Sequence, residues 1–186
     1  MGGSDEAVKD VQDAQKMGLD AFALNVQDVS SSWSTDAIQL LFNAAEDNNF
    51  KLFFSFDMAV LDQPSTFLPL FLQYQNSAAY YQHDGRPFVS TFDGGAKSFG
   101  ASSPGAGWQA QFKDVLASQG INPFFVPSHF DDFGGATYDA NFFNHYPVVD
   151  SAGNLPVLRL AKVLSMSAPP RIKLGYKRPM MWESYT

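Results

Sequence analysis

Lys51-Leu52-Phe53-Phe54-Ser55-Phe56-Asp57 is a nearly continuous apolar run that ends in a carboxylate. Runs of this kind are typical of a parallel strand that is covered on both faces. A carboxylate at the end of such a strand predicts a position at the mouth of an α/β sheet or barrel, where α/β enzymes hold their reactive groups.

Helical and strand patterns alternate on either side of this stretch. The apolar spacing predicts, in order, a helix over 5–17, a strand over 21–26, a helix to about residue 48 capped by Ser34 or Thr35, the strand over 50–57, a helix over 64–81 with a break near Pro69, a strand over 88–92, a helix over 108–118 and a strand over 123–127. This alternation indicates parallel βαβ units. The predicted fold class is therefore α/β, with about four consecutive βα units that amount to a partial (β/α)8 barrel of TIM type.

Composition and charge restrict the class of partner. The chain has 186 residues, 45% of them hydrophobic, and a net charge of −7. An acidic surface repels phosphate groups, which argues against nucleic acid and anionic membranes as partners. The absence of cysteine excludes thiol catalysis and Cys-ligated zinc. No apolar run reaches the ~18 residues of a membrane span, and the first residues show no signal peptide.

The charge balance inverts near residue 157. Residues 1–156 hold 18 acidic and 6 basic side chains, whereas residues 157–186 hold 6 basic side chains and one acidic side chain, Glu183. We therefore expect two regions: residues 1–156, which form the partial barrel, and a basic, irregular tail over residues 157–186 that does not belong to it.

Polar side chains follow the strands where right-handed crossovers would bring the carboxyl ends together. They include Asn25, Asp57, Asp93 and His129. A rim of carboxylates, amides and an imidazole suits a ligand with many hydroxyl groups. Five aromatic residues near this rim are candidates for stacking on sugar faces: Trp33, Phe99, Trp108, Phe130 and Phe133.

Each rim residue also has a purely structural interpretation. Asp57 suits a residue that caps the turn after its strand, and Asn25 suits a loop hydrogen bond equally well. Asp93 precedes two glycines, which is typical of a turn. His129 lies close to Asp131 and Asp132, but their spacing matches no common ligand pattern, so we expect no metal and no other cofactor.

Three segments resemble glycoside hydrolase family 71, the fungal α-1,3-glucanases or mutanases. They are Asp20-Ala21-Phe22-Ala23-Leu24-Asn25-Val26, Phe50-Lys51-Leu52-Phe53-Phe54-Ser55-Phe56-Asp57-Met58 and Gly85-Arg86-Pro87-Phe88-Val89-Ser90-Thr91-Phe92. The resemblance covers roughly residues 5–156. It implies a (β/α)8-type catalytic domain and endo-type hydrolysis of α-1,3-glucan, a cell-wall polymer, with inversion at the anomeric carbon.

The chain departs from the family pattern at two places. The family opens with a strand similar to His-Tyr-Met-Val-Gly before its first helix, and this chain has none. The family also carries a motif similar to Trp-Asn-Asp-Tyr-Gly-Glu, whose acidic residues are the leading candidates for the catalytic pair, and this motif is absent. We therefore expect a fragment that lacks the principal acid and base and is inactive by itself.

The resemblance also assigns provisional roles and a location. Asp57 matches an acid of the family and is expected to support the oxocarbenium-like transition state or to bind a sugar hydroxyl. Asn25, Asp93 and His129 are expected to bind substrate. The family implies secretion or a cell-wall location. Two unpaired edges of a four-stranded sheet would favour self-association.

Two other functions are consistent with the sequence. The first is a non-catalytic carbohydrate-binding or wall-associated protein that uses the same rim. The second is an unrelated α/β domain with a phosphate ligand. The second is disfavoured because no glycine-rich strand-to-helix turn is present.

Overall fold

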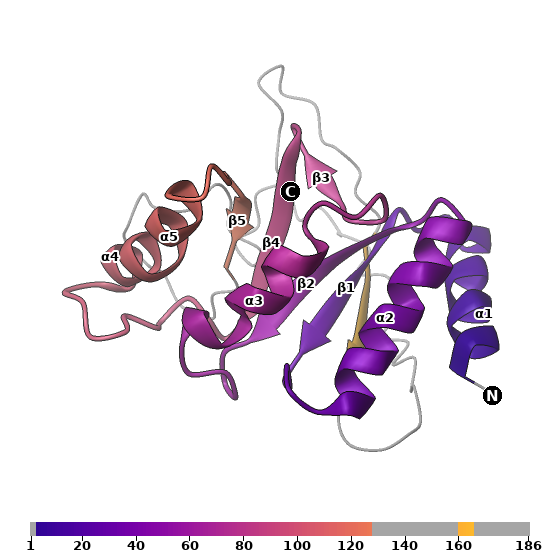
Figure 1. Cartoon of the computed structure of the whole chain (residues 1–186), viewed down its shortest axis with the longest axis horizontal. Coiled ribbons are helices and arrows are strands. Elements are labelled where there is room, and N and C mark those ends of the chain that lie inside the picture. The colour runs from indigo at the N-terminus through magenta and orange to yellow at the C-terminus, as the bar shows by residue number, and fades with distance from the viewer. Residues whose placement is uncertain (1–2, 128–159, 166–186) are drawn as a thin grey trace, which may run out of the picture.

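The centre of the computed structural model, which describes residues 3–127 and 160–165, is a parallel sheet (Figure 1). Four strands run parallel and follow one another across the sheet in chain order, namely β1 (Ala21–Val26), β2 (Lys51–Asp57), β4 (Arg86–Phe92) and β5 (Phe124–Val126). All four predicted strands are therefore confirmed, with shifts of one or two residues at their ends.

Helices connect the strands. They are α1 (Gly3–Lys16), α2 (Ser32–Asp47), α3 (Pro64–Tyr74) and a composite helix made of α4 (Pro104–Trp108), the π-helix η1 (Gln109–Lys113) and α5 (Asp114–Ala117). Figure 1 shows α1, α2 and α3 on one face of the sheet. No helix in the described part of the chain is long and apolar enough to cross a membrane. The alternation of helix and strand confirms the α/β class with a parallel sheet.

Aromatic side chains join these helices to the sheet. Phe54 of β2 lies against Phe42 of α2, with ring centroids 5.7 Å apart, and Phe56 stacks on Phe67 of α3 at 4.0 Å. Because side chains alternate along a strand, Phe53, Ser55 and Asp57 belong to the other face. The helices therefore bury one face of the sheet, and Asn25 and Asp57, two of the predicted site residues, lie on the opposite face.

The third helix is shorter than predicted. It ends at Tyr74 rather than near residue 81, because a turn follows in which the amide of Ala79 donates to Ser77 Oγ at 3.0 Å. Pro69 does not break it. The four buried apolar side chains around Pro69 hold the helix together despite the one backbone hydrogen bond that a proline removes: Phe67, Leu68, Leu70 and Phe71.

The sequence pattern did not predict the short hairpin at the beginning of β4. Strand β3 (Gln82–His83) pairs antiparallel with the beginning of β4. Asp84 and Gly85 form the turn, with φ values of 51° and 71°. Two positive φ angles in succession are the requirement of a type I′ turn, which Asp-Gly meets readily. The Asp-Gly pair was therefore a usable signal for this hairpin.

The tail is not irregular throughout, so that part of the prediction is wrong. Residues Leu160–Ser165 form β6, which pairs parallel with β1. This pairing satisfies backbone groups along an edge of β1 that was expected to be unpaired, so that β6 takes the place of β1 at that edge of the described sheet. Self-association stays a prediction. The predicted boundary at residue 156 lies outside the described residues.

Candidate functional site

The face of the sheet away from the helices changes from aromatic to polar toward the carboxyl ends of the strands. Phe88 lies 4.7 Å from Phe53 and 5.6 Å from Phe124, measured between ring centroids, so the three strands β2, β4 and β5 share an aromatic layer. The next layer is polar, because the register pairs Asn25 with Ser55 and Ser55 with Ser90. The polar layer leads directly to Asp57, the last residue of β2.

Asp57 is held by side chains from β1 and from the loop after it. Its Oδ2 accepts hydrogen bonds from Nδ2 of Asn25 at 3.2 Å and from Nε2 of Gln27 at 2.9 Å. The residue is only 3% exposed. A buried carboxylate requires such partners, because the desolvation penalty of a buried carboxylate without them is on the order of several kcal/mol. Asn25 and Asp57, both predicted as site residues, are therefore brought together.

The second oxygen of Asp57 has a structural role. Oδ1 accepts from the backbone amide of Ala59 at 3.1 Å, and the carbonyl of Asp57 accepts from the amides of Val60 and Leu61. This is the turn-capping role that was considered as the alternative for this residue. The two interpretations are not exclusive, because one carboxylate oxygen fixes the turn and the other receives the two amides.

Gln27 is a member of this cluster that the prediction did not select as a site residue. It follows Asn25 by two positions, so both side chains point to the same side of the extended chain. A polar pair at positions i and i+2 just past a buried strand is a signal that would have identified it. Both residues are partly exposed, whereas the carboxylate beneath them is buried.

Asp28 fixes the loop that carries Gln27. Its Oδ1 accepts from the amides of Ser30 at 2.8 Å and Ser31 at 2.9 Å, and its Oδ2 accepts from the Ser31 hydroxyl. These bonds, with the Ser31 hydroxyl first, hold the pKa of Asp28 well below its usual range. The hydroxyl of Ser34 donates back to the carbonyl of Asp28 at 2.5 Å.

The start of α2 is accordingly earlier than predicted. The N-cap is Ser31 rather than Ser34 or Thr35. Ser34 is fully buried, and its hydroxyl is directed back to the Asp28 loop. The sequence contained several serines that suit an N-cap, and the carboxylate of Asp28 selects among them by ordering the amides of Ser30 and Ser31.

The other predicted site residues are not joined to this cluster by the described contacts. Asp93 follows the end of β4 with a φ of 53°, the left-handed conformation that its turn interpretation anticipates. His129 lies outside the described residues. Asp93 and His129 therefore stay predictions as substrate-binding residues. Among the residues that the structure describes, no group of three or more His, Asp or Glu side chains is arranged to hold a metal ion.

Of the predicted sugar-stacking aromatics, Trp108 is part of the core and Phe99 is partly buried against it. Trp108 is fully buried, and its Nε1 donates to the carbonyl of Gly94 at 2.7 Å. Phe99 packs edge-on against it, with ring centroids 4.8 Å apart. Their contact anchors the loop after β4, and the buried Trp108 side chain is not available to a ligand. Phe130 and Phe133 lie outside the described residues, which leaves Trp33 among the five.

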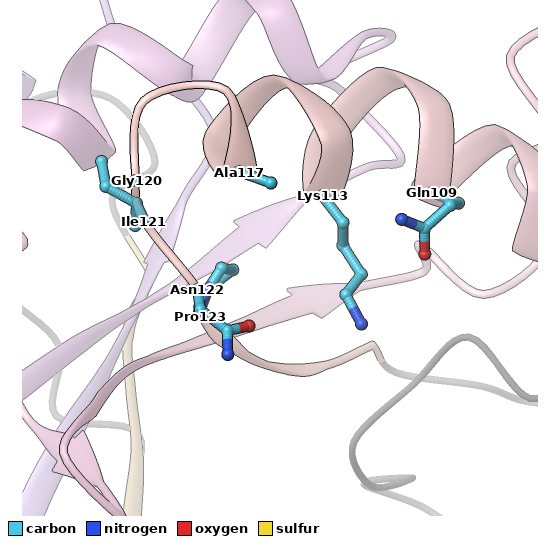
Figure 2. Close-up of a pocket in the computed structure, with 7 residues that line it drawn as sticks. All are labelled: Gln109, Lys113, Ala117, Gly120, Ile121, Asn122 and Pro123. Atoms are coloured by element: carbon cyan, nitrogen blue, oxygen red, sulfur yellow. The ribbon is translucent and has the colours of Figure 1, made fainter.

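A pocket of about 300 Å³ lies away from Asp57. It is lined by η1, α5 and the segment that leads into β5 (Gln109, Lys113, Ala117, Gly120, Ile121, Asn122 and Pro123). Figure 2 shows the side chains of Gln109, Lys113 and Asn122 turned toward the same space. Because Asn122 and Pro123 precede β5, the pocket is at the amino end of that strand, whereas Asp57 is at the carboxyl end of β2. It is not part of the predicted site.

The chain is similar in sequence to one family of known proteins. The model of glycosyl hydrolase family 71 matches residues 3–155. A glucan endo-1,3-alpha-glucosidase of Schizosaccharomyces pombe is 37% identical over 123 residues, which cover 64% of this chain and 28% of that protein. The ascus wall endo-1,3-alpha-glucanase of the same organism is 36% identical over 146 residues, which cover 76% of this chain and 32% of that protein.

Two further similarities concern a shorter segment and the fold. A mutanase of Penicillium rubens is 39% identical over 88 residues, which cover 46% of this chain and 20% of that protein. The GH99 endo-alpha-mannosidase of Bacteriodes thetaiotaomicron superposes with a TM-score of 0.56 at 14% identity, over 78% of this chain and 47% of that chain, and this likeness shows the fold alone. The chain spans a third or less of the length of the curated relatives that it matches.

Proposed function

Because the chain belongs to glycosyl hydrolase family 71, we propose that it is part of an endo-acting, inverting α-1,3-glucan hydrolase that works on the fungal cell wall. The names of the relatives support this substrate, since they are an endo-1,3-alpha-glucosidase, an ascus wall endo-1,3-alpha-glucanase and a mutanase. In this proposal the parallel sheet is one part of a (β/α)8-type barrel over residues 1–156.

The observation that carries the proposal is the amide-bound carboxylate at the end of β2. The side-chain amides of Asn25 and Gln27 each donate a hydrogen bond from nitrogen to Asp57. The carbonyl oxygen of each amide can accept a hydrogen bond from a sugar hydroxyl. The carboxylate fixes both amides in one orientation. Asp57 therefore has the role of a fixed negative charge under the reacting sugar, which favours an oxocarbenium-like transition state.

The hydrogen bonds of Asp57 do not suit a general acid. All three groups that contact its carboxylate oxygens are N–H donors, from Asn25, Gln27 and Ala59. An inverting enzyme requires a proton donor on one side of the sugar and a second carboxylate about 6.5–9.5 Å away that activates water. Asp28, which follows Gln27 in the chain, does not supply this second carboxylate in the described structure, because it is occupied by the two serines of its loop.

We further propose that this chain binds α-1,3-glucan without cleaving it, because its sequence has no motif similar to Trp-Asn-Asp-Tyr-Gly-Glu. The alternative function, a non-catalytic carbohydrate-binding protein, would use the same cluster. The two functions differ in what the complete parent protein does rather than in how Asn25 and Gln27 contact the sugar.

Two measurements test the proposal. The first incubates the chain with α-1,3-glucan and measures depletion from solution and release of reducing sugar. We expect depletion on α-1,3-glucan, less on cellulose or β-1,3-glucan, and no release. Release of reducing sugar would refute the inactivity, and the absence of any binding would refute the substrate.

The second measurement uses a full-length member of the family. A substitution equivalent to Asp57→Asn is expected to lower kcat by about 100-fold, the scale of removing one electrostatic contact to a transition state. A matched thermal unfolding curve separates this effect from loss of structure. Unchanged activity would show that the Asp57 carboxylate does not support the reaction.

A further inference from the structure

Phe92 is an aromatic residue beside Asp57 in the sheet. It is the last residue of β4, and the parallel pairing of β2 with β4 places it opposite Asp57. Neighbouring strands of a sheet are roughly 4.8 Å apart, so the two side chains leave the backbone at adjacent points. The amide of Met58 donates to the carbonyl of Phe92 at 2.8 Å, which fixes the pairing at this end of the two strands.

Phe92 and Asp57 also share one face of the sheet. Side chains alternate along a strand, so Phe92 belongs to the same face as Phe88, four positions earlier. The ring of Phe88 lies 4.7 Å from that of Phe53, and Phe53 is on the same face of β2 as Asp57. Phe92 therefore lies on the face away from the helices, where Asn25 also reaches Asp57.

The polar layer separates Phe92 from the aromatic layer beneath it. Ser55 and Ser90, which pair across β2 and β4, lie between the level of Phe88 and the level of Phe92. Ser90 and Thr91 are 3% and 1% exposed, whereas Phe92 is partly exposed. Phe92 is thus not a continuation of the buried aromatic layer. It is an aromatic residue at the point where β4 reaches the surface, level with the carboxylate.

The chain on both sides of Phe92 is held in place. The residue before it, Thr91, is buried and packs closely against Gly94, because a Cβ built on that glycine would lie 2.2 Å from Thr91 Oγ1. The carbonyl of Gly94 accepts a hydrogen bond from Nε1 of the buried Trp108 at 2.7 Å. Phe92 is therefore carried on a fixed backbone, and a preorganised aromatic residue loses little conformational entropy when a ligand binds to it.

The two sides of Asp57 consequently differ in chemistry. Strand β1 and the loop after it supply the amides of Asn25 and Gln27, and β4 supplies the ring of Phe92. A glucosyl unit is polar and apolar in the same way, because hydroxyl groups surround its rim and C–H groups cover its faces. C–H groups pack favourably on the negative face of an aromatic ring, and amide oxygens accept from hydroxyl groups.

We propose that Phe92 is the stacking surface of a glucosyl subsite at Asp57, and that Asn25 and Gln27 form the hydroxyl-binding side of the same subsite. This inference rests on the proposed function and adds one substrate-binding residue to it. In this arrangement the sugar contacts the two strands that flank β2, so that the carboxylate of Asp57 lies beneath the ring.

The test measures binding of the complete chain to soluble α-1,3-linked gluco-oligosaccharides by calorimetry. Phe92→Leu keeps an apolar side chain but removes the ring, and it is expected to raise Kd about fivefold. Phe92→Tyr keeps the ring and is expected to change Kd by no more than about twofold. Circular dichroism and a melting curve establish that each variant is folded.

Tyr81→Leu is the matched control. Tyr81 is a partly buried aromatic residue whose ring lies 5.6 Å from that of Phe88, on the same face of the sheet. It lies toward the amino end of β4, because Phe88 precedes Phe92 by four residues, or ~13 Å along a strand. Loss of this ring is expected to leave Kd unchanged. A rise in Kd equal to that of Phe92→Leu would mean that the loss of any ring on this face weakens binding, and it would refute the specific role of Phe92.

The outcomes separate this inference from the proposed function. If the wild-type chain binds and Phe92→Leu binds equally well, the role of Phe92 is refuted and the function stands. If the wild-type chain binds no α-1,3-linked oligosaccharide, both are refuted. If Phe92→Leu does not fold, the ring resonances of Phe92 in the wild-type chain, assigned by NMR with the Phe92→Tyr variant, decide. Resonances that do not shift at saturating oligosaccharide refute the inference.

Discussion

The amide nitrogen Nε2 of Gln27 lies 2.9 Å from Oδ2 of Asp57, although the two residues are 30 positions apart in the chain. The contact exists because β1 and β2 are parallel neighbours in register, with Val26 opposite Phe56. Their following residues, Gln27 and Asp57, are therefore brought to the same level of the sheet. The interaction links the loop after β1 to the turn after β2.

This link predicts a loss of stability when the carboxylate is removed. Asp57→Leu leaves the amides of Asn25 and Gln27 without their acceptor, and we expect a decrease of about 1–3 kcal/mol in the free energy of unfolding. Urea unfolding measures it. Asp62→Asn, at an exposed carboxylate of the same loop, is the control and should change stability by no more than about 0.5 kcal/mol. In a double-mutant cycle, Gln27→Ala should cost less in the Asp57→Leu background than alone; equal costs would mean that the two side chains do not interact in solution.

Asp28 predicts a decline of stability in acid. Its pKa is lowered in the folded chain by the Ser31 hydroxyl and then by the amides of Ser31 and Ser30, whereas in the unfolded chain it is about 3.9. The stabilisation is therefore present above about pH 4 and is lost as the pH falls below that value. Unfolding free energies measured between pH 6 and about pH 2.5 should decrease less steeply for Asp28→Asn than for the wild type. Ser32→Ala, at an exposed neutral residue of the same turn, should keep the wild-type slope.

Tyr80 is expected to cause a decline of stability in base. The side chain is fully buried, its hydroxyl donates to the carbonyl of Phe88 at 3.0 Å, and burial raises its pKa far above the usual value. A phenol with a pKa of about 10 in the unfolded chain favours unfolding once the pH rises above that value. Tyr80→Phe should lower stability at neutral pH by about 0.5–1.5 kcal/mol and should flatten its decline above about pH 10. A variant whose stability falls as steeply as that of the wild type would show that other groups cause the decline.

Substitution by alanine should lower the free energy of unfolding by different amounts at Gly107 and Gly120. A Cβ at Gly107 would lie 2.1 Å from the backbone carbonyl oxygen of Ser98, so Gly107→Ala should cost about 3 kcal/mol through overpacking. At Gly120 a Cβ would meet no atom within 4 Å, and only the positive φ of 76° opposes alanine, at a cost of about 1 kcal/mol. Chemical unfolding of both variants tests the order. Equal costs would imply that the chain near Ser98 moves to accept the methyl group.

The strands were predictable from the sequence because each is an apolar run bounded by polar or turn residues. Lys51–Asp57 is apolar on both faces in the sequence and is covered on both faces in the structure. The end of α3 was not predictable in the same way. After three polar residues, apolar residues resume at Ala78 and run to Tyr81, and the turn at Ser77 shows that they belong to the sheet side of the core.

The candidate site was partly predictable for a related reason. The position of Asp57 followed from strand direction alone, and Asn25 followed from parallel pairing. That Gln27 joins them, whereas Trp108 does not, depends on where side chains point after the strands end. Trp108 is in the interior because its indole nitrogen reaches the carbonyl of Gly94, a contact across 14 residues of loop and helix that no spacing rule specifies.

The aromatic layer formed by Phe53, Phe88 and Phe124 has an electrostatic consequence for the carboxylate at the end of β2. These rings are 0–7% exposed and provide a medium of low polarisability beneath the polar layer of Asn25, Ser55 and Ser90. Charges at the boundary of such a medium are weakly screened from below. The field of Asp57 is therefore concentrated toward the carboxyl ends of the strands. If the proposed function holds, this field would stabilise a positive charge that develops on a sugar there more strongly than open solvent would.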